Sequence, residues 1–173
     1  MKPLILPYKG IVPKIASDAF IAPGAVIIGD VEIGSQTNVW FGCIIRGDVN
    51  TIRIGSRTNI QDGTVIHVTR KTGPTKIGNN VTIGHSVLIH ACTIEDDSFI
   101  GMHSTIMDNA VVRSKGMVAA GAIVTPKKEI PTGEIWAGNP ARFLRKMRQE
   151  ETDFIAISAQ NYVELAEEYR SQS

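Results

Sequence analysis

Isoleucine or valine occupies every sixth position through most of the chain. The series of nineteen positions begins at Ile15, ends at Ile130 and is interrupted three times. Its members are Ile15, Ile21, Ile27, Ile33, Val39, Ile45, Ile54, Ile60, Ile66, Ile77, Ile83, Ile89, Ile94, Ile100, Ile106, Val112, Val118, Val124 and Ile130. Neither an α-helix nor a hairpin sheet needs a period of six. Such a repeat is instead typical of a chain that winds in flat triangular coils.

The residues around these aliphatic anchors favour the same architecture. Each hexapeptide is one side of a triangle, so three make a coil of about 18 residues, and coils stack about 4.8 Å apart like parallel strands. Glycine directly follows five anchors, at Gly34, Gly55, Gly78, Gly84 and Gly101. Small or β-branched residues lie four positions after an anchor, where corners are tight, at Ala25, Thr37, Thr58, Thr64, Val81, Ser98, Ser104 and Ala110. The pattern predicts an all-β fold, a parallel β-helix, without fixing its hand.

The two ends of the chain differ from the repeats. Residues 1–14 contain three prolines and one glycine, and we expect them to form an extended N-terminal arm. We assign residues 15–135 to the β-helix and residues 136–173 to an exit segment and a C-terminal helix. A loose apolar stripe predicts one amphipathic helix, or two, from Ala141 to about Tyr169, packed alongside the coils and covering their open end strand. The stripe consists of Leu144, Met147, Phe154, Ile155, Ile157, Tyr162, Leu165, Ala166 and Tyr169.

Composition and charge exclude several classes of protein. The 173 residues fit one domain with a sizeable core, and a net charge of +1 gives no sign of a nucleic-acid or membrane-surface partner. No stretch approaches a transmembrane span, and the apolar run near Met1 is too short for a secretory signal. Cys43 and Cys92 lack zinc or redox spacing, which favours two buried thiols in a reducing cytosol. We therefore expect a cytoplasmic protein.

Two of the four histidines fall at equivalent places on successive coils. His67 directly follows the anchor Ile66, and His90 directly follows Ile89. The 23 residues between the two histidines equal one coil plus a five-residue interruption at a protruding loop. Because side chains alternate between the inside and outside of a strand, both histidines should project outward and stack.

A third histidine belongs to a neighbouring face. His85 lies two residues after Ile83, at or near a corner, so one chain could not easily aim it at His67 and His90. If three copies pack around a threefold axis, His85 of one copy can meet the pair of the next. Three imidazoles with a fourth position open for water are typical of catalytic zinc. Three unrelated surface histidines are the alternative interpretation.

Polar residues near these histidines follow the same register. Arg46 follows its anchor as His67 does, one coil below, and Asp48 lies two residues further on at the corner. Gln61 follows Ile60, and Asp62 occupies the slot that His85 takes one coil later. These charged groups could form an ion-pair network that holds subunits together, or could take part in catalysis. The two roles are compatible.

The combination of these residues resembles the γ-class carbonic anhydrase family. The resemblance rests on Arg46-Gly47-Asp48, Asn59-Ile60-Gln61-Asp62, His67, Gly84-His85-Ser86 and Ile89-His90, and it extends over nearly the whole chain. It implies a left-handed β-helix, a homotrimer, and Zn²⁺ between subunits, although three histidines also suit Fe²⁺ and Co²⁺. It further implies an enzyme that interconverts CO2 and bicarbonate.

The resemblance also implies roles for individual residues. His67 and His90 from one chain and His85 from the next would be the metal ligands, and a metal hydroxide would attack CO2. Gln61 would hydrogen-bond that hydroxide or the bicarbonate. The remaining implied residues of the site are Arg46, paired with Asp48 or Asp62 across the interface and able to bind bicarbonate, Asn59 near the site, and Tyr162 from the C-terminal helix.

The chain departs from the founding archaeal type of this family in two places. Val49 occupies the position at which that type has a glutamate, and the protruding loop at residues 69–74 is short and basic where that type has acidic residues. One of those acidic groups is taken as a proton shuttle. Its loss is expected to leave the metal site intact and to slow proton release.

Two other functions remain open on the sequence alone. The same scaffold carries acyl transfer and could support CoA-thioester hydrolysis, for which Arg70 and Lys71 could meet the CoA phosphates. A non-enzymatic alternative is a metal-binding trimer that acts as a structural subunit or a bicarbonate sensor. Fold analogy does not rank these functions, because activity belongs to the site.

Overall fold

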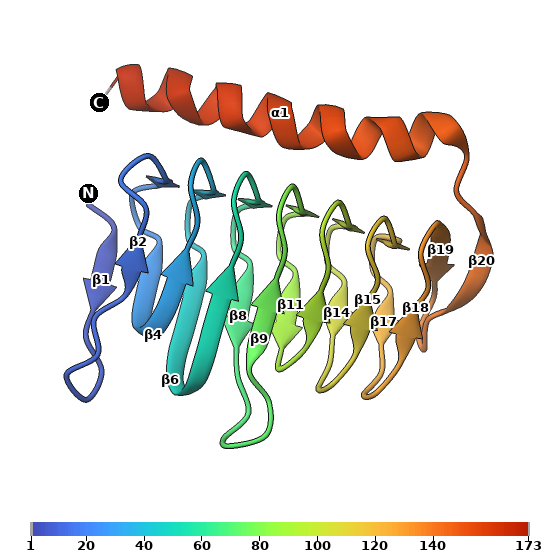
Figure 1. Cartoon of the computed structure of the whole chain (residues 1–173), viewed down its shortest axis with the longest axis horizontal. Coiled ribbons are helices and arrows are strands. Elements are labelled where there is room, and N and C mark those ends of the chain that lie inside the picture. Colours follow the sequence, from blue (N-terminus) through green and yellow to red (C-terminus); the bar gives the residue numbers. More distant parts are fainter. Residues whose placement is uncertain (1, 173) are drawn as a thin grey trace.

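The computed structural model describes residues 2–172 as one parallel β-helix with one long α-helix beside it (Figure 1). The helix is α1 (Gln149–Ser171). The strands are β1 (Leu4–Leu6), β2 (Lys14–Ile15), β3 (Phe20–Ile21), β4 (Val26–Ile33), β5 (Asn38–Val39), β6 (Ile44–Ile54), β7 (Asn59–Ile60), β8 (Val65–His67), β9 (Thr75–Ile77), β10 (Thr82–Ile83), β11 (Leu88–His90), β12 (Thr93–Ile94), β13 (Phe99–Ile100), β14 (Thr105–Ile106), β15 (Val111–Val112), β16 (Met117–Val118), β17 (Ile123–Val124), β18 (Glu129–Ile130), β19 (Glu134–Ala137) and β20 (Arg142–Lys146). The prediction of a hexapeptide-repeat β-helix with a C-terminal helix alongside is confirmed.

Three faces surround the interior of the coils. One face is an eight-stranded sheet in the order β20-β19-β16-β13-β10-β7-β5-β3. The other two faces carry β8-β11-β14-β17 and β9-β12-β15-β18, and they join into one sheet because β4 and β6 continue around a corner. The coils pair in parallel, anchor above anchor, so residues that follow equivalent anchors form outward ladders.

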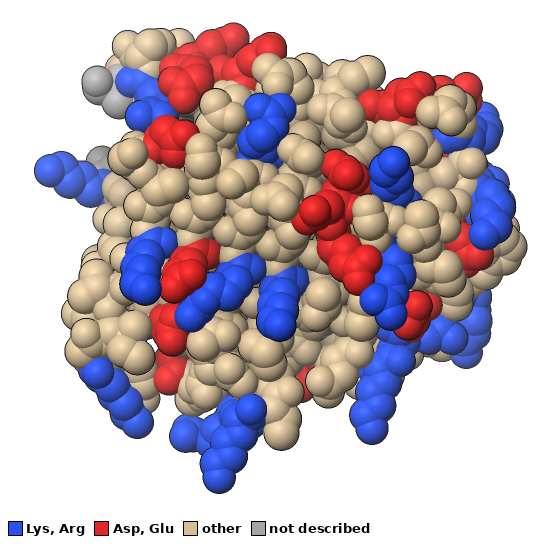
Figure 2. Space-filling view, viewed as in Figure 1, with Lys and Arg blue, Asp and Glu red and all other residues tan. Residues whose placement is uncertain are grey.

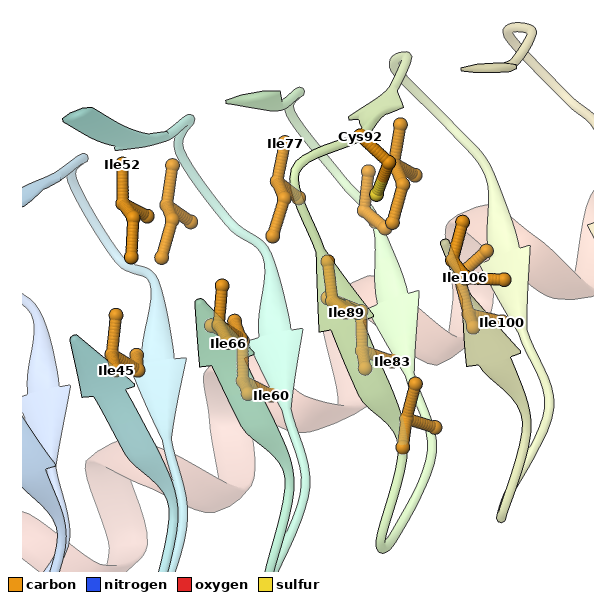
Figure 3. Close-up of a cluster of buried hydrophobic side chains, with 14 of the residues drawn as sticks. Ile45, Ile52, Ile60, Ile66, Ile77, Ile83, Ile89, Cys92, Ile100 and Ile106 are labelled. Atoms are coloured by element: carbon orange, nitrogen blue, oxygen red, sulfur yellow. The ribbon is translucent and has the colours of Figure 1, made fainter. Parts of the chain in front are cut away.

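The aliphatic anchors form the core as the sequence predicts. All nineteen are buried except Ile15 and Ile21 in the first coil, and stacked anchors such as Ile66 and Ile89 point into the interior (Figure 3). Cys43 and Cys92 are free and buried among them. Burial raises the pKa of the Cys43 thiol to about 11 and that of Cys92 to about 12, so both thiols are protonated packing residues.

Small residues at the corners join one coil to the next. The Thr37 hydroxyl donates to the Gly55 carbonyl at 2.7 Å, and the Thr58 hydroxyl donates to the Gly78 carbonyl at 2.8 Å. Both threonines are fully buried, so these bonds satisfy backbone groups that water cannot reach. The small residues predicted at the corners therefore serve both packing and hydrogen bonding.

The N-terminal arm and the protruding loop are both ordered by backbone pairing. In the arm, β1 pairs in parallel with β4 and so adds a strand to the sheet. The loop lies between β8 and β9 and extends beyond the coils (Figure 1). An antiparallel bridge between Thr69 and Gly73 closes it. The loop thus starts two residues after His67.

The C-terminal segment differs from the predicted helix at Ala141–Tyr169. Residues 142–146 form β20, which pairs antiparallel with β19, and the helix begins only at Gln149. The edge of the last coil is therefore covered by β20, whereas α1 runs back along the coils toward the N-terminus (Figure 1). An exposed sheet edge offers unpaired backbone groups, and pairing with them outweighs local helix propensity.

The face of α1 that contacts the coils matches the predicted stripe only in part, through Ile155, Ala166 and the two tyrosines that pack on Trp40. Its buried residues are Ile155, Ser158, Ala159, Val163 and Ala166, which recur every three or four positions. Phe154, Ile157 and Leu165 are exposed instead. Small residues at the contact, Ser158 and Ala159, allow the helix backbone to approach the sheet closely, and the partly exposed Phe154 ring still lies 6.2 Å from that of Phe99.

Charged side chains alternate in sign on the outer surface of the coils. Lys14 lies 3.2 Å from Glu32, and Arg53 lies 2.7 Å from Asp30 on the neighbouring coil. Figure 2 shows basic and acidic residues interspersed over the face in view. Within residues 2–172, no helix has the length and apolar character needed to cross a bilayer.

We expect the Glu151→Gln variant to melt at a lower temperature than the wild type at pH 7. Both Arg145 guanidinium nitrogens donate to the Glu151 carboxylate at 2.7 Å, and the Arg148 backbone N–H adds a third bond at the start of α1. These bonds lower the pKa of Glu151, so their contribution is complete above the unfolded pKa of about 4.3 and is lost as pH falls through the lower folded pKa. The difference in melting temperature between the variant and the wild type should be smaller at pH 3 than at pH 7. Glu150→Gln is the control, and an equal loss there would contradict the prediction.

Candidate metal centre

His67 and His90 stack on the outer face formed by β8 and β11. They are direct partners in the parallel register of the two strands. Their ring centroids lie 5.3 Å apart, and Nδ1 of His67 faces Nε2 of His90 at 3.2 Å. The stacked pair predicted from the coil spacing is therefore present. Ile66 and Ile89 hold it in place, since each anchor is fully buried directly before its histidine.

A carboxylate holds the far side of each imidazole. Nε2 of His67 lies 3.0 Å from Asp48, and Nδ1 of His90 lies 2.7 Å from Asp108. An ionised carboxylate only accepts, so each neutral ring donates its N–H outward and turns its lone pair toward the other ring. Two nitrogens that bind one tetrahedral zinc ion stand about 3.3 Å apart. The facing nitrogens, at 3.2 Å, therefore fit a shared metal ion.

The surroundings keep both carboxylates ionised. Burial opposes the charge on Asp48, but hydrogen bonds from His67 and Arg46 outweigh it and lower the pKa of Asp48. Burial likewise opposes the charge on Asp108, and bonds from Thr69 and His90 lower its pKa. The two aspartates thus fix the orientation of the rings.

His85 lies on a different part of the chain surface. It occupies the turn between β10 and β11, at the corner between the helix-covered face and the histidine face. Its Nδ1 is 2.9 Å from Asp62 one coil below, and both side chains are nearly half exposed. This stacking follows the predicted register. Within the described part of the chain, no three His, Cys, Asp or Glu side chains converge on a common point.

Gln61 and Asn59 lie on the face covered by α1. Both are buried, and the Gln61 amide nitrogen donates to the Asn59 carbonyl oxygen at 3.1 Å. Gln61 and His85 line a common groove whose other walls are small or apolar, including Phe99 and Met102. The groove is thus a largely apolar space with two polar groups at one end.

Arg46 lies in β6, whereas Tyr162 lies in helix α1. Arg46 forms an ion pair with Asp48 within the chain. Tyr162 packs edge-on against Trp40, with ring centroids 5.7 Å apart. Burial, with a smaller effect from the Asp62 charge, raises the pKa of Tyr162, so its hydroxyl stays protonated at neutral pH.

Asp108 and Thr69 are contacts that the sequence reasoning missed. Asp108 lies 18 residues after His90, which is one coil, so the same register argument would have placed it beside that histidine. Thr69, from the start of the protruding loop, donates its hydroxyl to Asp108. The loop therefore connects directly to the carboxylate that orients His90.

We expect Asp108→Ala to weaken zinc binding by about 10- to 100-fold, the usual loss when the outer partner of a ligating histidine is removed. Without Asp108, the Nδ1 proton of His90 loses its acceptor and the ring is free to turn. Competition with a chelating dye measures the affinity. Asp153→Ala, on the exposed surface of α1, is the control and should bind zinc as the wild type does. Equal affinities for all three proteins would contradict this role of Asp108.

Comparisons with known proteins agree with the repeat and identify relatives of the whole chain. The bacterial transferase hexapeptide model (six repeats) matches residues 13–47. The mitochondrial protein named gamma carbonic anhydrase 1 of Arabidopsis thaliana is 52% identical over 93% of this chain, which spans about 60% of that relative. The protein named carbonic anhydrase of Geobacillus kaustophilus is 38% identical, over 97% of this chain and 92% of its own length. A hexapeptide transferase family protein from Anaplasma phagocytophilum, 48% identical, superposes with a TM-score of 0.93 over 96% of this chain and 98% of its own.

Proposed function

Because the chain belongs to the γ-class carbonic anhydrase family, we propose that it catalyses the reversible hydration of CO2 to bicarbonate at a metal centre shared between subunits of a homotrimer. The observation that carries the proposal is the pair of facing nitrogens on His67 and His90, 3.2 Å apart. Without a cation or an extra proton between them, two lone pairs would oppose each other at that distance. A metal ion at that position would remove the repulsion, and the pair would then supply two of the three proposed ligands.

His67 and His90 of one subunit, with His85 of the next, would hold the metal ion. Three imidazoles suit Zn²⁺, and Fe²⁺ or Co²⁺ fit the same donors. A bound zinc ion lowers the pKa of a water ligand to about 7 and so supplies hydroxide at neutral pH. Asp48 and Asp108 keep the histidine nitrogens turned toward the metal position.

Support for a subunit interface at the histidines comes from the apolar ladder next to them. Ile44 and Leu88 project from the same outer face as His67 and His90, and each is 41% exposed. Burying such a side chain completely from full exposure is worth about 1.5–3 kcal/mol, and covering the part still exposed here would supply a corresponding share. A neighbouring copy would cover this ladder and bring its own His85 to the pair.

The chain's other polar residues would bind and orient the substrate. CO2 is apolar, and the groove beside Gln61 and His85 is walled mostly by apolar and small side chains. The Gln61 amide is the group in that groove able to orient CO2 or bicarbonate by hydrogen bonding, and it is 6% exposed. The Arg46 guanidinium, which is paired with Asp48, suits the bicarbonate anion.

Proton release is expected to be the slow step in this protein. Val49 and the loop at residues 69–74 provide no carboxylate for proton transfer. A buffer from solution would then accept the proton. Turnover should therefore rise with the concentration of a small imidazole buffer.

Stopped-flow measurement of CO2 hydration tests the proposal. The zinc-loaded protein, and the Fe²⁺-loaded protein under anaerobic conditions, should accelerate hydration; the rate should fall to background on chelation and return with metal. Absence of turnover from fully metallated protein would overturn the proposal. Hydrolysis of acyl-CoA thioesters, assayed on the same preparation, would then identify the alternative activity on this scaffold.

A further inference from the structure

A chain of buried side chains connects Gln61 to helix α1. The Gln61 amide nitrogen donates to Asn59, and the Asn59 amide nitrogen donates to the Thr82 hydroxyl oxygen at 2.9 Å. The Thr82 hydroxyl in turn lies 2.9 Å from the hydroxyl of Ser158. All four residues are at most 6% exposed. Since Ser158 is on α1, the helix takes part in a hydrogen-bond chain that ends at the groove.

The Thr82 oxygen accepts a hydrogen bond from the Asn59 amide nitrogen, and either hydroxyl of the Thr82–Ser158 pair can be the donor. We take Thr82 as the donor, because its single proton is then paired inside the protein. Asn59 must then present its carbonyl oxygen to Gln61, which in turn uses its amide nitrogen there. With the bonds in this direction, the carbonyl oxygen of Gln61 and its second N–H face the groove.

Loss of the Ser158 hydroxyl would allow the hydrogen bonds of the chain to run in the opposite direction. The buried Thr82 proton would have no acceptor, and an unsatisfied buried donor costs about 1–3 kcal/mol. Rotation of the Asn59 amide by half a turn removes that penalty, because its carbonyl oxygen then accepts from Thr82. Gln61 must rotate as well, and its NH2 group then faces the groove.

We propose that Ser158 and Thr82 are positioning residues that determine which end of the Gln61 amide faces the reacting centre. The inference rests on the proposed function and deepens it, since it assigns to the C-terminal helix a part in orienting the substrate. Neither residue touches the groove itself, whose lining contains Gln61 but not Thr82 or Ser158.

A second contact between α1 and the coils provides a matched control. The Arg57 guanidinium donates to the Gln160 side-chain oxygen at 2.7 Å, two residues along the helix from Ser158. Gln160→Ala removes this contact and leaves the hydrogen-bond chain unchanged. It therefore separates the effect of a loosened helix from the effect of a reversed amide.

The kinetic experiment uses zinc-loaded protein and compares kcat with kcat/KM. Ser158→Ala and Thr82→Val should each lower both by about tenfold, with unchanged zinc content, and the double variant should lose no more than either single one. Thr82→Ser, which keeps the hydroxyl, and Gln160→Ala should stay within about twofold of the wild type. A Gln160→Ala loss equal to that of Ser158→Ala, or no loss for Ser158→Ala, would overturn the proposal.

A second measurement is independent of turnover. The chain has five glutamines, so selective 15N labelling gives five side-chain amide signals, and a Gln61→Leu spectrum assigns the one of interest. In Ser158→Ala the chemical shift of the Gln61 amide should change, and its protons should exchange faster with solvent. In Gln160→Ala the chemical shift should stay the same. An unchanged Gln61 signal in Ser158→Ala would overturn the inference. If the wild type does not hydrate CO2, the proposed function fails, and this spectrum alone decides whether the hydrogen-bond chain orients Gln61.

Discussion

The His90→Ala variant is expected to lose zinc binding by more than about 100-fold and to hydrate CO2 at the background rate. The loss should exceed the 10- to 100-fold typical of removing an outer partner, because a proposed ligand itself is removed. One of the two facing nitrogens disappears, and Asp108 is left with no ring to orient. Metal analysis of the purified protein and stopped-flow kinetics measure the two effects.

His103 provides the control for this experiment. It lies in an exposed turn one coil beyond His85, whose carbonyl accepts its backbone N–H at 2.9 Å. His103→Ala should keep both zinc and activity, since the side chain stacks one coil beyond His85 and lies outside the His67–His90 ladder. Full zinc occupancy in His90→Ala would show that the metal is held elsewhere and would contradict the assignment of the pair.

The Gly55→Ala variant is expected to be destabilised by on the order of 3 kcal/mol, the upper range for overpacking a rigid site. A methyl group at Gly55 would lie 2.7 Å from the backbone carbonyl of Gly78, and one at Gly34 would lie 2.6 Å from that of Gly55. These glycines form a column in which each coil rests directly on the next. Relief of such a clash requires the coils to move apart, which disturbs the hydrogen bonds on both sides.

Equilibrium unfolding in urea, followed by circular dichroism, measures this loss. Ser56→Ala is the matched control, because it introduces the same residue one position along and only removes a hydroxyl. It should change the free energy of unfolding by less than about 0.5 kcal/mol, as is usual outside the core. Equal stability of the Gly55→Ala and wild-type proteins would contradict the close stacking of the coils.

The repeat made most of the fold predictable from the sequence. An anchor every six residues fixes which side chains point inward, and the coil length then fixes which residues stack. The stacking of His67 on His90, and of His85 above Asp62, followed from that arithmetic alone. The same arithmetic, applied one coil further, reaches Asp108, which was missed because the ladder was not followed beyond His90.

The C-terminal segment could not be predicted in the same way because it carries no repeat. Residues 142–146 include good helix formers, yet they pair with β19, since the last coil offers an open edge. The apolar stripe was right only in part. Ser158 and Ala159, which it did not include, face the coils, whereas Ile157 and Leu165, which it did include, are exposed. The hydrogen bond from Ser158 to Thr82 likewise depends on tertiary structure.

Mixing two inactive variants tests the shared metal centre most directly. His85→Ala and His90→Ala should each be inactive alone. In trimers reassembled from equal amounts, about one interface in four combines an intact His85 with an intact His67 and His90, so about a quarter of wild-type CO2 hydration should return. Recovery of zinc-dependent activity near that level would agree with a site built from two subunits. No recovery in mixed trimers of verified composition would contradict it.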